Sequence, residues 1–182
     1  MRAAVFRKPE APVSIEELEL AALREGEVLL DIVAAGVCHS DYHLVTGHRT
    51  PRAIPWVMGH EGAGVVREVG PNVKSLVPGD KVILSIDAMC GYCRNCTSGH
   101  PALCETYPYT PISRMTSHGE PVFHVRPTFS EQTIALADAC VTVPDDTPLE
   151  KACLIGCAVI TGIGAVIRRA RVETGATMAV FG

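Results

Sequence analysis

Four cysteines are the residues of this sequence whose spacing most directly indicates chemistry. Cys90, Cys93 and Cys96 are separated by two-residue gaps, and Cys104 follows after seven more residues. Two-residue gaps let the chain turn so that successive sulfur atoms face one centre, and a fourth thiolate completes a tetrahedron around Zn²⁺ at about 2.3 Å per bond. Because four protein ligands close the coordination sphere, we expect a structural zinc that stabilises a lobe at about residues 87–108.

Two other uses of these cysteines compete with zinc. Disulfides are one, but the sequence has eight cysteines and no secretory signal, which favours thiolates in a reducing compartment. A [4Fe–4S] cluster is the other. Its bacterial motif has a three-residue final gap and a proline after the last cysteine, whereas Glu105 follows here. The spacing therefore favours zinc.

A second set of candidate ligands is dispersed along the chain. Cys38 follows one expected strand, His60 precedes the next, and Cys157 lies in an apolar run. A catalytic zinc takes three protein ligands and keeps a fourth position open, which these side chains could provide. Taken singly, Cys157 also fits a small buried side chain and His60 a core histidine, so both interpretations stay open at this point.

Short strands must position these residues in the first two-thirds of the chain. Runs rich in Val, Ile or Leu, separated by proline and glycine turns, predict strands over 2–6, 27–34, 62–69, 81–86, 131–136 and 140–143. Their spacing suits a compact antiparallel barrel better than alternating strands and helices. Between residues 85 and 129 the pattern predicts a long loop that contains the four cysteines.

The pattern changes after Pro144, so we expect one unit over 1–147 and the start of another over 148–182. Thr147, Pro148 and Glu150 form a capping-box sequence that predicts the start of a helix, and a second helix is expected over 158–169. Residues 177–181 predict a strand. Because that strand has no sheet to join, we expect an amino-terminal portion of a chain about twice as long.

The composition excludes several classes of protein. The 182 residues are 47% hydrophobic and 20% charged, which is typical of a folded globular chain. A net charge of -4 with scattered Lys and Arg argues against a nucleic-acid or anionic membrane partner. The longest uncharged run, over 152–167, is shorter than the ~20 residues that a membrane-spanning helix needs. We expect a cytoplasmic protein.

Taken together, the motifs resemble the zinc-dependent alcohol dehydrogenases of the medium-chain dehydrogenase/reductase superfamily. The resemblance covers essentially the whole chain, in order and in spacing. The segments that support it are 36–41, 59–64, the four-cysteine lobe, 78–82, 156–157 and 161–162. It implies a mainly β fold with some α. A GroES-like barrel with a zinc-stapled lobe would occupy residues 1–147, and the truncated start of a Rossmann NAD(P)-binding domain would follow.

The resemblance also implies roles for the residues of the dispersed set. Cys38, His60 and Cys157 correspond to the ligands of the catalytic zinc. Glu61 resembles the acidic neighbour that approaches the metal. Asp41 matches the carboxylate that accepts a hydrogen bond from the ligand histidine, which fixes the imidazole tautomer.

The implied reaction is the reversible oxidation of a primary or secondary alcohol to an aldehyde or ketone by hydride transfer to NAD(P), with NAD favoured. Ser40 matches the hydroxyl that takes the alcohol proton, and His43 the outer end of a relay to solvent. His39, Thr161 and Gly182 are the implied cofactor contacts. We expect two Zn²⁺ per chain, one catalytic and one structural, and a homo-oligomer (a dimer or tetramer) in the full-length form.

The resemblance gives less information about the substrate. Ile86, Phe123 and His124 are implied to line the pocket, and the aliphatic Ile86 leaves space for a bulky or aromatic alcohol. The glutathione-dependent formaldehyde dehydrogenase branch commonly has an acidic residue where Arg49 stands and a tyrosine where His43 stands. These two departures make that branch a less favoured alternative.

Two further alternatives remain. Polyol or sugar dehydrogenases often use a glutamate in place of the third cysteine ligand, so Cys157 favours the alcohol branch. A non-catalytic, zinc-stapled barrel is the alternative from a different class. The presence of Ser40 and His43 beside the ligand set argues against it, because a structural barrel needs no proton relay.

Overall fold

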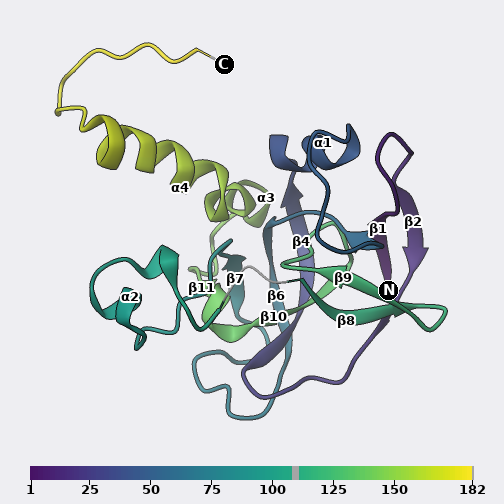
Figure 1. The fold of residues 1–182 in the computed structure, drawn as a ribbon. Coiled ribbons are helices and arrows are strands. Elements are labelled where there is room, and N and C mark those ends of the chain that lie inside the picture. The colour runs from purple at the N-terminus through teal and green to yellow at the C-terminus, as the bar shows by residue number, and fades with distance from the viewer. Residues whose placement is uncertain (108–110, 182) are drawn as a thin grey trace.

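The computed structural model describes residues 1–107 and 111–181, and two β-sheets form its body (Figure 1). One sheet has six strands in the order β2–β1–β5–β9–β8–β3. Its strands are β1 (Arg2–Phe6), β2 (Ser14–Glu17), β3 (Glu19–Leu20), β5 (Trp56–Val57), β8 (Ile112–Ser117) and β9 (Glu120–His124). Neighbouring strands are antiparallel except β5 and β9. The mainly β, antiparallel fold expected from the sequence is confirmed.

The second sheet has five strands in the order β10–β4–β6–β7–β11. They are β4 (Glu27–Gly36), β6 (Glu61–Val69), β7 (Lys81–Leu84), β10 (Gln132–Leu136) and β11 (Cys140–Thr142). Each coincides with a run that the sequence predicts as a strand. Its core cluster comprises Val28, Leu30, Val66, Leu76, Val82, Leu84, Ala135 and Ala137. Because a one-residue slip would turn these side chains toward solvent, their burial fixes the register.

The β8–β9 hairpin shows that the expected unbroken loop over 85–129 is wrong. The two strands pair antiparallel across a turn at His118 and Gly119, both of which have positive φ. Positive φ at both central residues is the turn geometry that matches the twist of paired strands. The hydrophobic pattern does not reveal β8, because a buried arginine, Arg114, lies in the middle of this strand. The α2 (Arg94–Thr97) and η1 (Pro101–Leu103) segments belong to the part of the loop that remains.

A buried ion pair joins the two sheets. Arg114 of β8 and Glu27 of β4 are 5% and 7% exposed. The guanidinium donates from Nε to Oε1 at 3.0 Å and from Nη2 to Oε2 at 2.7 Å. The same carboxylate accepts the backbone N–H of Arg24 at 2.7 Å. With both partners present the charges are compensated, but either charge alone would be stranded in the interior.

Helices gather at one end of the sheets (Figure 1). α1 (His39–Val45) follows β4, and α3 (Leu149–Ala152) and η3 (Cys153–Gly156) pack against β4, β6 and β7. α4 (Ala158–Ile163) continues into the π-helical η4 (Gly164–Ala170), which confirms the helix expected over 158–169. Within the described residues no single helix is long and apolar enough to cross a membrane. The bent pair 149–156 and 158–170 meets that test only when both parts are counted together.

Two details of the C-terminal segment differ from the sequence-based expectations. The helix near Pro148 exists, but Pro148 itself is its N-cap and no side chain caps it. Glu150 therefore stands at the second helical position, one short of the position that a capping box requires. Residues 177–181 form no strand, since no strand in the described part of the chain lies beside them to pair with, and Val180 and Phe181 are 80% and 93% exposed. The boundary between 1–147 and 148–182 stays a prediction.

Replacing Arg114 by methionine should lower the free energy of unfolding by about 3–5 kcal/mol, because Glu27 would keep a buried charge without its partner. The matched control is Arg67→Met, which removes an ion pair with Asp31 in which both side chains are well exposed. That variant should lower the free energy of unfolding by less than about 1 kcal/mol. Urea denaturation of the zinc-loaded chain measures both values. Similar small losses for the two variants would contradict the prediction.

Candidate functional site

The dispersed residues converge on one point. Ligand atoms of Cys38, His60, Glu61 and Cys157 all lie within 4.8 Å of one another. Cys38 precedes α1, His60 precedes β6, Glu61 is the first residue of β6, and Cys157 precedes α4. Three segments far apart in the sequence thus meet at the helical end of the five-stranded sheet.

Close backbone packing explains this convergence. In the β4–β6 pairing Gly36 stands opposite Glu61, which brings the chain leaving β4 beside the start of β6. A Cβ atom at Gly36 would collide with the Glu61 carboxylate and the Leu154 side chain, so any larger residue would require these two side chains to move. Likewise, a Cβ atom at Gly156 would collide with the carbonyl oxygen of Leu84. This second approach sets the position of the next residue, Cys157.

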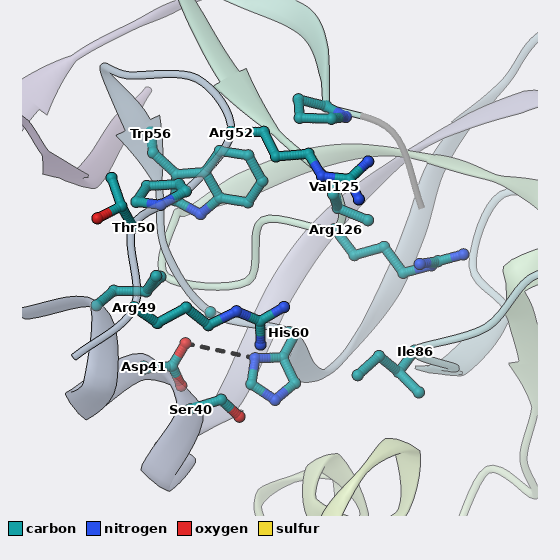
Figure 2. Close-up of a pocket in the computed structure, with 14 residues that line it drawn as sticks. Ser40, Asp41, Arg49, Thr50, Arg52, Trp56, His60, Ile86, Val125 and Arg126 are labelled. Atoms are coloured by element: carbon teal, nitrogen blue, oxygen red, sulfur yellow. Dashed lines mark ion pairs between the residues drawn. The ribbon is translucent and has the colours of Figure 1, made fainter. Parts of the chain in front are cut away.

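Asp41 orients the histidine of the cluster. Its Oδ1 lies 3.3 Å from Nδ1 of His60, as the dashed line in Figure 2 shows, and its Oδ2 accepts the backbone N–H of Cys38 at 3.0 Å. The hydrogen bond that the Asp41 carboxylate accepts from the imidazole raises the pKa of His60. Nε2 of His60 is buried and has no hydrogen-bond partner among the described residues. The ring therefore directs its second nitrogen into the interior, where this atom is available as a metal ligand.

The electrostatics of the cluster fit a cation. Desolvation, together with the negative charges of Cys38 and Glu61, raises the pKa of Cys157 to about 11. Glu61 is 2% exposed, and its Oε2 has no hydrogen-bond partner in the described part of the chain. Two thiols, a carboxylate and an imidazole in such close contact are a donor set suited to Zn²⁺, whose charge would let the thiols ionise.

The four cysteines of the lobe also lie together. The sulfur atoms of Cys90, Cys93, Cys96 and Cys104 are within 4.8 Å of one another. Cys90 Sγ accepts the backbone N–H of Cys93 at 3.3 Å and the hydroxyl of Thr106 at 3.2 Å. All eight cysteines are free in this structure, and the use of the four lobe sulfurs as thiolate ligands stays a prediction. The set fits a structural zinc with four sulfur ligands.

The expected relay residues lie on α1. Ser40 lines the cavity beside His60, and its Oγ is 3.1 Å from Cys38 Sγ. His43 is half-buried, and its ring centroid is 4.7 Å from that of the exposed His39. No hydrogen bond joins Ser40 to His43 among the described residues, so a relay between them would need an intermediary.

The expected cofactor contacts are more scattered. Thr161 is exposed on α4, while Gly182 lies outside the described residues. His39 is exposed at the start of α1. These three assignments stay predictions.

A cavity of about 490 Å³ opens beside His60 and is lined by Ile86, as expected from the sequence (Figure 2). The expected Phe123 and His124 do not line it. His124 is completely buried in β9, and the cavity wall is instead formed by the next two residues, Val125 and Arg126. The sequence indicates a loop where β9 forms, and the residues that reach the cavity are those that follow this strand.

Arg49, Arg52 and Trp56 also line the cavity, and the sequence reasoning did not assign them to it. The signal was present. Two arginines stand in a proline-containing loop shortly before His60, in a chain whose one other arginine cluster is at residues 168–171.

Comparison with known proteins places this arrangement in a family. The model of the alcohol dehydrogenase GroES-like domain matches residues 24–145. The chain belongs to this family. The GroES-like region thus covers the five-stranded sheet, three strands of the six-stranded sheet and the four-cysteine lobe, and the resemblance stated from the sequence is confirmed.

Individual relatives of this GroES-like chain are dehydrogenases. The S-(hydroxymethyl)glutathione dehydrogenase of Photobacterium damsela subsp. piscicida is 42% identical over 100% of this chain and 52% of its own length. The alcohol dehydrogenase zinc-binding domain protein from Burkholderia ambifaria has a TM-score of 0.89 and 38% identity, over 100% of this chain and 52% of its own. The benzyl alcohol dehydrogenase from Acinetobacter calcoaceticus has a TM-score of 0.80 and 30% identity, over 92% of this chain and 47% of its own. The chain spans about half the length of these relatives.

Replacing Gly156 by alanine should weaken metal binding at the dispersed cluster. The added methyl group would collide with the Leu84 carbonyl, and the displaced backbone would carry Cys157 away from its neighbours. We expect the zinc content to fall toward one ion per chain, measured by elemental analysis. Gly162→Ala on α4 is the control, since its Cβ atom meets nothing within 4 Å. Full zinc content in Gly156→Ala would refute the positioning role.

The buried His124 should make stability pH-dependent. Burial lowers the pKa of its ring to about 4, whereas a histidine in an unfolded chain titrates near ~6.5. Between these values the unfolded chain binds the extra proton. The contribution of His124 is therefore complete above about pH 6.5 and is lost as the pH falls toward 4.

The unfolding free energy of wild type should fall between pH 7 and pH 4.5. We expect this fall to be smaller by about 2–3 kcal/mol in His124→Phe. Urea denaturation across a pH series measures it. His118→Asn, in the exposed hairpin turn, is the control and should leave the pH dependence unchanged. Parallel pH curves for wild type and His124→Phe would contradict the prediction.

Proposed function

We propose that this chain is the catalytic portion of a zinc-dependent alcohol dehydrogenase. Its reaction is the reversible oxidation of a primary or secondary alcohol to an aldehyde or ketone, with hydride transfer to NAD(P), NAD being favoured. The observation that supports this most directly is the meeting of Cys38, His60 and Cys157 beside a cavity that Ser40 also lines. Residues that could bind a metal and a residue that could take a proton thus share one site.

Each side chain has a definite part in this proposal. Cys38, His60 and Cys157 hold the catalytic zinc, which when bound supplies Lewis-acid polarisation of the substrate oxygen. Asp41 keeps the His60 ring oriented through the 3.3 Å contact with Nδ1. Glu61 contributes a buried carboxylate at the edge of the same cluster, which would help to exchange ligands at the open position.

Proton movement is assigned to α1. The Ser40 hydroxyl faces the cavity, where it can accept the proton of a bound alcohol and pass it on. His43 is the outer group of this relay. Its Nδ1 is buried without a partner among the described residues, which leaves that nitrogen able to accept a bond from an intermediary such as a cofactor hydroxyl. His39 and Thr161 are proposed as contacts of the cofactor.

The four-cysteine lobe is proposed as a structural zinc site. Cys90, Cys93, Cys96 and Cys104 leave no ligand position open, so the ion would stabilise the lobe without taking part in the reaction. In this proposal the full-length protein is a cytoplasmic homo-oligomer, a dimer or a tetramer. Its substrates are small alcohols and aldehydes.

A second candidate is S-(hydroxymethyl)glutathione dehydrogenase activity. The curated relatives with this name, at 42% and 40% identity, support it. Arg49 and His43 stand at positions where that branch commonly has an acidic residue and a tyrosine. We therefore place this reaction second to the oxidation of another alcohol.

Metal counting tests the proposed function. The chain should hold two zinc ions, and both Cys93→Ser and Cys157→Ser should hold one. Cys93→Ser should also loosen the lobe, seen as faster proteolysis near residues 87–108, whereas Cys157→Ser should leave the fold intact. Cys140→Ser is the control, because this thiol lies outside both clusters. A wild-type count of one, unaffected by Cys157→Ser, would instead indicate a non-catalytic, zinc-stapled barrel.

A further inference from the structure

Three arginines line the cavity beside His60. Arg49 and Arg52 belong to the loop between α1 and β5, and Arg126 follows β9. Figure 2 shows the Arg49 side chain extending toward His60, with Arg52 and Arg126 near Val125. Three guanidinium groups therefore share one cavity with a proposed ligand of the catalytic zinc.

Few negative charges oppose them. Asp41 is the one acidic residue that lines the described part of the cavity, and its carboxylate is already engaged by the Cys38 backbone and by His60. Among the described residues, no carboxylate forms an ion pair with Arg49 or Arg52. The local charge of the cavity is therefore positive.

Four arginines outside the cavity have carboxylate partners among the described residues. These ion pairs are Arg2–Glu131, Arg7–Glu16, Arg7–Glu120, Arg67–Asp31 and Arg114–Glu27. The whole chain has a net charge of -4, so a positive cavity does not follow from a basic composition. Two guanidiniums that line a cavity without forming such a pair, those of Arg49 and Arg52, are suited to an anionic ligand.

The rest of the lining suits the body of an organic molecule. Leu44, Trp56, Ile86 and Val125 supply apolar surface to the same cavity. The volume of about 490 Å³ lies within the range of small-molecule sites. The cavity therefore combines apolar surface with positively charged groups beside His60.

We propose that the cavity selects alcohols that carry a carboxylate group. The substrate hydroxyl would lie toward Ser40 and His60, and its carboxylate toward Arg49 and Arg52. The planar guanidinium fork matches the two oxygens of a carboxylate, which gives orientation as well as affinity. This specificity rests on the proposed function, since that function determines which end of the substrate faces the metal cluster.

Binding of two matched ligands to the zinc-loaded chain tests the proposal without turnover. 4-(Hydroxymethyl)benzoate and 4-(hydroxymethyl)benzamide have nearly the same shape and differ in charge. Titration followed by ¹H–¹⁵N NMR gives both dissociation constants and the residues that respond. We expect about tenfold tighter binding of the benzoate, with shifts at Arg49 and Arg52. Added salt should weaken the binding of the benzoate and leave the binding of the benzamide unchanged.

Substitution identifies the groups responsible. The double variant Arg49→Gln/Arg52→Gln should reduce the preference for the benzoate to less than about twofold. Both side chains are exposed, so the fold should be retained, which the NMR spectrum itself reports. Arg2→Gln/Arg67→Gln, which changes two exposed arginines outside the cavity, is the charge-matched control and should keep the full preference.

Three results would overturn the proposal: equal affinity for the two ligands, a preference that survives in the double variant, or displacement of the benzoate by ADP with stronger shifts at Arg49 and Arg52. The last result would assign the arginines to a nucleotide phosphate. Failure of the proposed function is a separate outcome, because it appears in the zinc count. If the chain holds no zinc at Cys157 and still prefers the benzoate, the anion site is supported and the proposed dehydrogenase function is contradicted.

Discussion

The site depends on two glycines at which an added Cβ atom would collide with a neighbouring segment. At Gly36 the end of β4 lies against the side chains of Glu61 and Leu154, and at Gly156 the helical segment lies against the Leu84 carbonyl. The first contact brings Cys38 close to His60, and the second brings Cys157 to the same cluster. The contact at Gly156 is backbone against backbone, so it leaves no flexible side chain to absorb a displacement. The ligand geometry is therefore determined by the sheet itself.

The two cysteine clusters of this GroES-like chain lie in different surroundings. The lobe cysteines are partly exposed and are held by local backbone and hydroxyl donors such as Thr106. The dispersed cluster lies against a buried carboxylate, Glu61, beside a cavity with three arginines. Negative charge on one side and positive charge on the other produce a steep change in potential across a few residues. Such a change suits a site that must hold a cation and receive a substrate next to it.

Much of this could be predicted from the sequence, and the exceptions have physical causes. Aliphatic runs predicted the strands of the five-stranded sheet, since burial of alternate side chains leaves a periodic pattern. The pattern missed β8 because Arg114 is buried there by pairing with Glu27, a partner far away in the sequence. Cavity residues such as Val125 were also missed, because which side of a strand end faces a cavity depends on tertiary packing. Residues 177–181 have the composition of a strand, but composition cannot supply a neighbour to pair with.

The positions of the two clusters along the chain also set an order of assembly. The lobe ligands lie within residues 90–104, and three of them lie within seven consecutive positions, so only short loops need to close around an ion. The dispersed set runs from residue 38 to residue 157 and is incomplete until the segment after η3 has docked on the sheet. During synthesis from the N-terminus, the lobe can capture metal while the remaining chain is still being made. An ion at the dispersed set would need Cys38, His60 and Cys157 already in place, so its retention would report that these three segments have packed together.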